Sequence, residues 1–216
     1  MKKYCAYCGD GIDKETTEHV FPKCLYPQSR AKSRVPRLTV PACNRCNNSW
    51  SDDEAHFRNV LLVSGDPNEA VKEIWNTKAL RSFNEVDGHK RVRELLKQMH
   101  KVQTSTGERW AIYPASDESV MRIVRKVIRG LCHYHSVMSP VSDKRVWATV
   151  QRYQVPRAFL DEMEHHHREE DIAKYSYCVL NEPPIHSVWL ITFYQRRTFI
   201  GMVSTLENGF PETGWG

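Results

Sequence analysis

The chain has 216 residues, of which 40% are hydrophobic, and its formal net charge is +5. This length allows one large domain or a small module followed by a larger one, and the mild positive charge is compatible with a polyanionic partner. No apolar segment follows Met1-Lys2-Lys3, and no apolar run approaches the ~18 residues that a membrane span requires. These features exclude a membrane-spanning class and lead us to expect a soluble, cytoplasmic protein without a signal peptide or a membrane partner.

The first predicted feature is a metal site made by two C-x-x-C pairs, Cys5/Cys8 and Cys43/Cys46. The total of seven cysteines is odd, which argues against a disulfide framework in an intracellular protein. Each pair can present two thiolates to one ion, so that together they complete a tetrahedral zinc site. Since thiolates would fill all four positions, we expect this zinc to be structural and to stabilise a segment with little core of its own.

The segment between the two pairs contains Thr17-Glu18-His19-Val20-Phe21-Pro22, and Asn47-Asn48 directly follows Cys46. This combination resembles the HNH endonucleases, in particular the zinc-bearing branch with one C-x-x-C before an acid–His pair and a second C-x-x-C followed by Asn. The resemblance covers residues 5–57, about a quarter of the chain. It implies a ββα-metal fold, in which a β-hairpin and a helix hold one catalytic divalent metal ion.

By position, the resemblance implies that His19 is the general base that activates water. Glu18 would bind the catalytic metal ion, and Asn47 would be its second ligand. Carboxylate and amide oxygens suit Mg²⁺ or Mn²⁺, and an imidazole can accept a proton near neutral pH. The middle Asn of the family pattern is replaced by Leu38, so the usual means of fixing the loop that carries the base is missing. Glu54 could add a ligand, although a surface position is the simpler interpretation.

The charged residues from position 23 to position 45 are all basic. They are Lys23, Arg30, Lys32, Arg34, Arg37 and Arg45. A basic stretch beside an acid–His pair suits a bound phosphate backbone, and a solvated loop is the alternative.

From about Ser49 the pattern becomes helical, and Ser64-Gly65-Asp66-Pro67 ends this helix. We place a boundary there, between an N-terminal module at 1–65 and an accessory module at 66–216. The elements expected in the second module are helices at 68–83, 89–100, 116–138 and 156–169 and strands at 110–113, 145–153, 175–180, 187–194 and 198–204. The predicted fold class is α+β, with a zinc-stapled first module and a mostly antiparallel C-terminal sheet in the second.

The helix at 116–138 separates into an apolar stripe and a basic stripe. The basic stripe contains Arg122, Arg125, Lys126 and Arg129. It could follow a nucleic-acid backbone beside the nuclease site, and an ordinary solvated face is the equal alternative.

These observations give the hypothesis of a divalent-metal-dependent endonuclease that hydrolyses phosphodiester bonds in nucleic acid, with DNA as the expected substrate. The alternative is a non-catalytic zinc protein that binds nucleic acid through its basic residues. A homodimer would suit double-strand cutting, but the sequence does not determine the oligomeric state.

Overall fold

The computed structural model describes residues 3–12, 16–32, 35–64, 67–104, 107–112, 117–169 and 171–211. The N-terminal part consists of two small antiparallel hairpins followed by two helices. Its elements are β1 (Lys3–Tyr4), β2 (Gly11–Ile12), β3 (Thr16–His19), β4 (Thr39–Ala42), α1 (Asn44–Asn48) and α2 (Ser51–Leu62). Two 3₁₀ turns, Lys23–Leu25 and Gln28–Lys32, lie in the connection between β3 and β4.

A helical layer and a hairpin follow. They comprise α3 (Glu69–Ile74), a π-helical turn (Trp75–Ala79), α4 (Leu80–Phe83), α5 (Gly88–Lys97), β5 (Met99–Thr104) and β6 (Gly107–Ile112). The first three form one continuous helical segment, which confirms the helix expected at 68–83. Asn68 begins it, because its side chain accepts a hydrogen bond of 2.9 Å from the backbone N–H of Val71. The helix expected at 89–100 ends early, since its last residues enter β5.

The longest helix is α6 (Glu118–Tyr134), whose N-cap is Asp117. The Asp117 carboxylate accepts a hydrogen bond of 3.1 Å from the backbone N–H of Val120. Ser116, the first residue of the helix expected at 116–138, lies outside the described residues.

The C-terminal part is a five-stranded antiparallel sheet with the order β7-β11-β10-β9-β8. Its strands are β7 (Val146–Val150), β8 (Glu164–Glu169), β9 (Ala173–Glu182), β10 (Ile185–Phe193) and β11 (Arg197–Ser204). This sheet, with the helices, confirms the α+β class and the antiparallel C-terminal strands.

The helix expected at 156–169 is wrong in its second half. Only Arg157–Asp161 is helical (α7), and the chain then forms the edge strand β8. Pairing with β9 explains the difference, because alternate side chains of β8 meet different faces of the sheet. The ring of His166 stacks on Tyr175 at a centroid distance of 4.8 Å, whereas His165 and His167 stack on each other.

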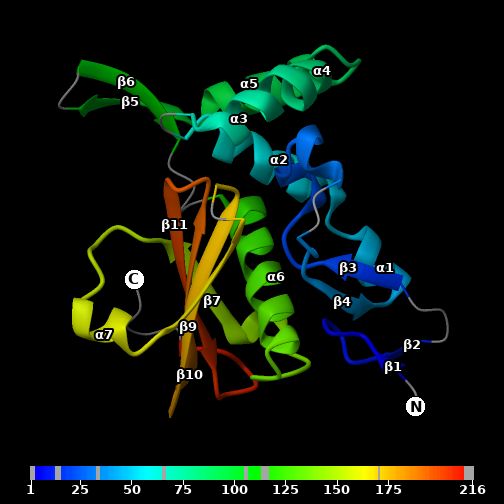
Figure 1. Ribbon diagram of the computed structural model, residues 1–216, viewed down its shortest axis with the longest axis vertical. Coiled ribbons are helices and arrows are strands. Elements are labelled where there is room, and N and C mark those ends of the chain that lie inside the picture. The colour runs from blue at the N-terminus through cyan, green and yellow to red at the C-terminus, as the bar shows by residue number, and fades with distance from the viewer. Residues whose placement is uncertain are drawn as a thin grey trace.

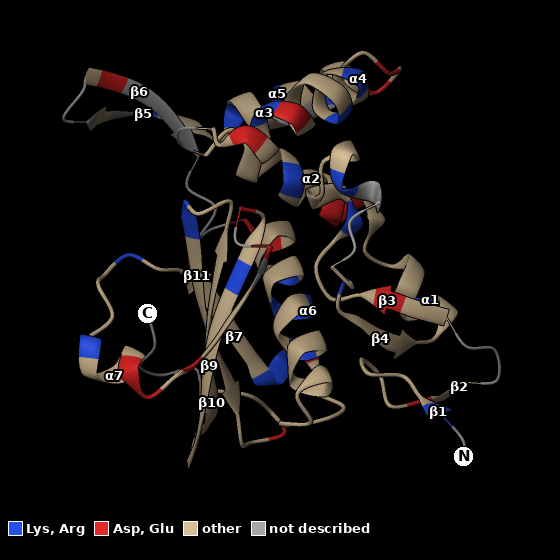
Figure 2. Cartoon of the chain, viewed as in Figure 1, with Lys and Arg blue, Asp and Glu red and all other residues tan. Residues whose placement is uncertain are grey.

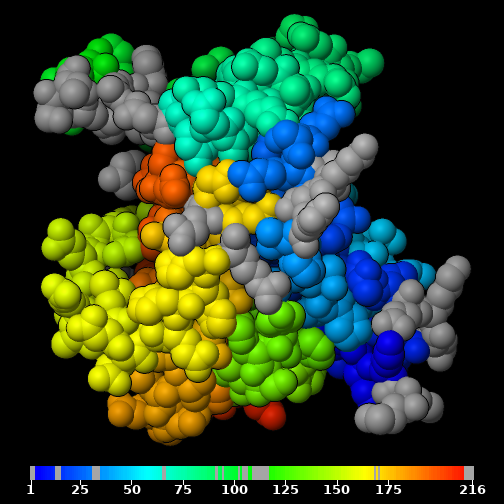
Figure 3. All heavy atoms as spheres, in the orientation of Figure 1, coloured from blue at the N-terminus to red at the C-terminus, as the bar shows by residue number. Residues whose placement is uncertain are grey.

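The sheet, α6 and the N-terminal hairpins lie side by side, with α6 in the middle (Figure 1). One continuous set of buried residues runs from Cys5 to Val203, so residues on both sides of the predicted boundary at 65 share a core. Phe57 of α2 packs edge-on against Phe193 of β10, with ring centroids 5.1 Å apart. Figure 3 shows the N-terminal segments in direct contact with later parts of the chain.

Helix α6 approaches the first hairpins closely at Gly130. A Cβ at this position would lie 3.1 Å from the hydroxyl oxygen of Tyr7 and 3.2 Å from the Cγ atoms of Val20. Glycine therefore allows a spacing that a larger residue would widen. Within the described part of the chain, no helix combines the length and apolarity needed to cross a membrane.

Candidate zinc centre and the Glu18–His19 site

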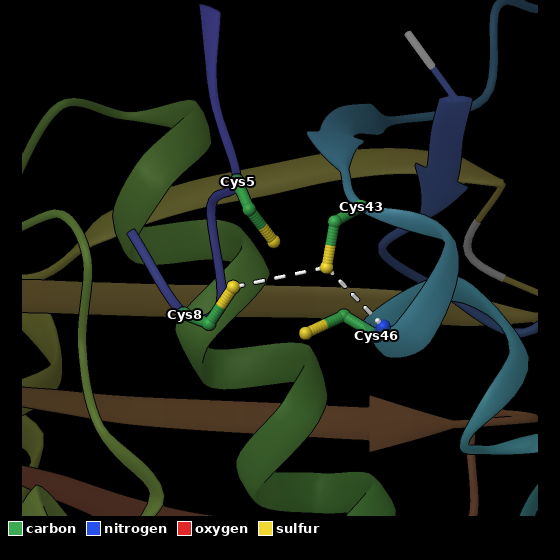
Figure 4. A group of neighbouring side chains, drawn as sticks. All are labelled: Cys5, Cys8, Cys43 and Cys46. Carbon is green, nitrogen blue, oxygen red and sulfur yellow. Dashed lines mark hydrogen bonds between the residues drawn. The ribbon is translucent and has the colours of Figure 1, made fainter. Parts of the chain in front are cut away.

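The four predicted zinc ligands come together. The sulfur atoms of Cys5, Cys8, Cys43 and Cys46 all lie within 4.8 Å of one another (Figure 4). The first pair lies in the turn between β1 and β2, and the second pair lies at the start of α1. Such a group of four thiols can hold a metal ion such as zinc, as the spacing predicted.

Local backbone structure shapes both cysteine turns. In the first, the N–H of Gly9 donates to the carbonyl of Cys5 at 2.9 Å, and Gly9 has a φ of 76°, which favours glycine. In the second, Cys43 is the N-cap of α1 and its sulfur accepts from the N–H of Cys46 at 3.5 Å. Both turns therefore present their sulfur atoms to the same point.

The electrostatics of the cluster favour a bound cation. Burial acts to raise the pKa of Cys5, but backbone hydrogen bonds outweigh it and lower the pKa to about 7. Burial and the neighbouring thiols raise the pKa of Cys46. Four thiolates at this spacing repel one another, so a divalent cation is what would allow all of them to ionise.

Glu18 and His19 end β3, which pairs with β4 so that Glu18 faces Val40 and His19 faces Thr39. Helix α1, which carries Asn47, packs against β3. The chain thus forms an antiparallel hairpin that carries Glu18 and His19, followed by a helix that carries Asn47. Asn47 is partly exposed and lies inside α1.

Leu38, at the position of the missing Asn, has a buried side chain and a backbone role. Its carbonyl accepts a hydrogen bond of 3.0 Å from the N–H of Val20, the residue after His19. A main-chain contact therefore ties the end of β3 to the segment before β4.

The carboxylate of Glu18 is buried and points to α6. Its Oε1 lies 2.5 Å from Nζ of Lys126, and the same Nζ lies 2.6 Å from Oε1 of Glu54. Lys126 has no exposed side-chain surface and also donates to the carbonyl oxygen of His19 at 3.0 Å. We call Glu18, Glu54 and Lys126 the carboxylate–lysine cluster.

His19 is half-buried in a positively charged environment. Burial lowers its pKa to about 4, and the charges of Lys23, Arg37 and Lys126 act in the same direction. Its imidazole is therefore neutral at neutral pH and able to accept a proton. Among the described side chains, Nδ1 of His19 is one of the buried polar atoms without a hydrogen-bond partner.

The predicted basic residues of the first module have different surroundings. Lys23 is exposed close to His19, and Arg37 stacks over the ring of Tyr26 at 4.2 Å. Arg30 pairs with Asp171 at 2.8 Å. Arg45 is largely exposed and pairs with Asp10 at 3.0 Å. The side chain of Lys32 and the whole of Arg34 lie outside the described residues.

The basic stripe expected on α6 is not an exposed face. Lys126 is 0% exposed and Arg129 is 7% exposed. The guanidinium of Arg129 donates to the carbonyl oxygens of Tyr7 at 2.7 Å and Val141 at 2.6 Å. The expectation that Lys126 and Arg129 contact nucleic acid is therefore wrong. Both side chains are buried and hydrogen-bonded inside the protein, because α6 is covered on both sides.

The other two residues of this stripe reach the surface with acidic partners. Arg122 pairs with Asp53 at 2.5 Å and lies over the ring of Trp50, whereas Arg125 pairs with Asp143 at 2.9 Å and with Glu118. Basic segments are spread over many elements, with acidic segments among them (Figure 2).

The pairing of Lys126 was not predicted from sequence, and Glu54 was expected either at the surface or as an added ligand. A signal was available, because Ile123, Ile128 and Cys132 add apolar residues outside the apolar stripe of α6. Apolar residues outside a single stripe indicate a helix that is covered on more than one side, and a buried lysine requires an acidic partner.

Comparisons of the chain with protein-family models, curated proteins and solved structures gave no match.

Proposed function

We propose that this protein is a nuclease of the HNH class, which hydrolyses phosphodiester bonds in nucleic acid with His19 as the general base. One observation carries the proposal. An antiparallel hairpin, followed by a helix and joined to a four-cysteine cluster, carries Glu18 and a neutral histidine on which several cations act.

The donor chemistry at Glu18 fits a divalent cation. Two carboxylates, from Glu18 and Glu54, already converge on one positive charge, that of Lys126. Glu18 and Asn47 would hold Mg²⁺ or Mn²⁺ through hard oxygen ligands. Such an ion supplies positive charge to the phosphoryl oxygen and the leaving oxygen when it is bound.

The side chains of this chain would perform the remaining tasks. The neutral imidazole of His19 would accept the proton of the attacking water. Lys23 and Arg37, whose charges act on His19, would attract the phosphate and orient it. The cysteine-bound zinc would take no part in the chemistry, because thiolates fill its coordination sphere.

Plasmid nicking with added Mg²⁺ or Mn²⁺ tests this proposal. We expect the wild-type protein to nick DNA and His19→Ala to be slower by about a hundredfold or more, because general base catalysis contributes at least that much. His89→Ala, which changes an exposed histidine in α5, is the matched control and should keep full activity. Full activity of His19→Ala would overturn the mechanism, and zinc content with thermal unfolding would show that each variant is folded.

A non-catalytic nucleic-acid-binding protein is the second candidate. The exposed positive charges of Lys23 and Arg45 favour this function, because they could bind phosphate groups without a catalytic site. Salt-dependent binding of DNA or RNA without cleavage of either, at any concentration of divalent ion, would support this function instead.

A further inference from the structure

The ammonium group of Lys126 occupies a site built by three elements. Glu18 of β3 and Glu54 of α2 each provide a carboxylate oxygen, and the carbonyl of His19 provides the third acceptor. These three oxygens use all three N–H donors of an ammonium group. Lys126 itself comes from α6 and has no exposed side-chain surface.

The two carboxylates require a cation in this position. The side chains of Glu18 and Glu54 are only 10% and 18% exposed, so neither is well solvated. Two such carboxylates repel one another, and burial disfavours their ionised forms. A lysine or a metal ion could each meet the requirement.

We propose that Lys126 is the resident cation of the Glu18–Glu54 pair and competes with a divalent metal ion for both carboxylates. Binding of the metal ion displaces the ammonium group, and Glu54 becomes a second carboxylate ligand. This inference rests on the proposed metal-binding role of Glu18 and adds a regulation of the same site. Without metal the cluster keeps β3, α2 and α6 together, and with metal the same oxygens hold the ion.

Mn²⁺ binding, followed by electron paramagnetic resonance without nucleic acid, gives the first test. Lys126→Met removes the competing charge and nearly preserves the side-chain volume. We expect it to bind Mn²⁺ more tightly than the wild type by on the order of tenfold or more, as expected for a unit charge in contact with the site. Mn²⁺ should also raise the melting temperature of this variant more than that of the wild type.

The matched control is Lys23→Met, which removes an exposed charge that also acts on Glu18. Screening by solvent should limit its effect on Mn²⁺ affinity to less than about threefold. Equal or weaker Mn²⁺ binding by folded Lys126→Met would overturn the proposal, as would an equally large gain in Lys23→Met.

Lysine ammonium signals in the NMR spectrum of the wild-type protein give a second test that does not depend on the stability of a variant. In the metal-free protein, the buried Lys126 ammonium should exchange slowly with water and give its own signal. Addition of millimolar Mg²⁺ should shift or remove this signal and leave those of exposed lysines unchanged. An unchanged Lys126 signal would overturn the proposal, whether or not Mg²⁺ binds elsewhere.

These measurements separate the inference from the proposed function. Displacement of Lys126 by metal without cleavage of nucleic acid would support the inference and remove the nuclease function. Metal-dependent cleavage with Lys126 still bound to Glu18 would support the nuclease function and overturn the inference.

Discussion

The histidine at the end of β3 differs from an exposed histidine in one property that experiments can measure. Burial lowers the pKa of His19 to about 4, with support from Lys23 and Arg37. The ordinary value is about 6.5. The imidazole is therefore neutral in the folded protein over a range where it is protonated in the unfolded chain.

This difference predicts a dependence of stability on pH. Between about pH 6.5 and pH 4 the unfolded state binds the proton and the folded state does not, so the stability contributed by neutral His19 is present above this range and lost as the pH falls. His19→Gln should remove that contribution. We expect the melting temperature of the wild type to fall more between pH 7.5 and pH 5 than that of His19→Gln.

The same measurement on His89→Gln is the control, because His89 is exposed. Its melting temperature should follow the wild type at both pH values. Parallel curves for wild type and His19→Gln would contradict the lowered pKa.

The elements that could be predicted from the sequence are those whose conformation depends on residues close together in the chain. The two cysteine turns follow from C-x-x-C spacing, and the β10–β11 hairpin follows from two apolar runs separated by a short turn. The strand β8 could not be predicted, because its conformation depends on pairing with β9. The cover on both sides of α6 likewise depends on distant segments, so the burial of Lys126 and Arg129 became clear only in three dimensions.

The cysteine cluster predicts one tightly bound zinc per chain. In Cys43→Ser we expect the zinc measured by elemental analysis to fall to near zero. The protein should also lose several kcal/mol of stability, since structural zinc in small peptides supplies an apparent ~10–16 kcal/mol. Unfolding by urea would measure the loss.

Cys178→Ser is the matched control, because Cys178 lies in β9 and outside the cluster. It should keep its zinc and nearly all of its stability. A wild-type protein purified without zinc, or a Cys43→Ser variant that still retains it, would refute the metal assignment.

For the whole molecule, the main feature is a core shared by both ends of the chain. Phe57 packs against Phe193 and Phe199, and the hydroxyl of Tyr194 donates to the carbonyl of Leu25 at 2.8 Å. The module boundary expected near residue 65 therefore coincides with the end of α2. Residues on both sides of it belong to a common core.

This arrangement predicts that the fragment 1–65 does not fold by itself. With zinc it should bind the metal but lack a dispersed NMR spectrum, because the surfaces that bury Leu25 and Phe57 are absent. The full chain in the same buffer is the reference. A well-dispersed spectrum for the zinc-bound fragment would instead establish an independent domain.

The spacing of the cysteines has a further consequence for the reaction of the protein with oxidants. Sulfur atoms of Cys8 and Cys43 lie 3.7 Å apart and come from two different turns. Loss of two electrons from this pair would form a disulfide and leave too few thiolates to retain zinc. Peroxide would then remove the zinc, although the proposed chemistry uses no sulfur. A thiol reductant with added zinc would restore the metal site.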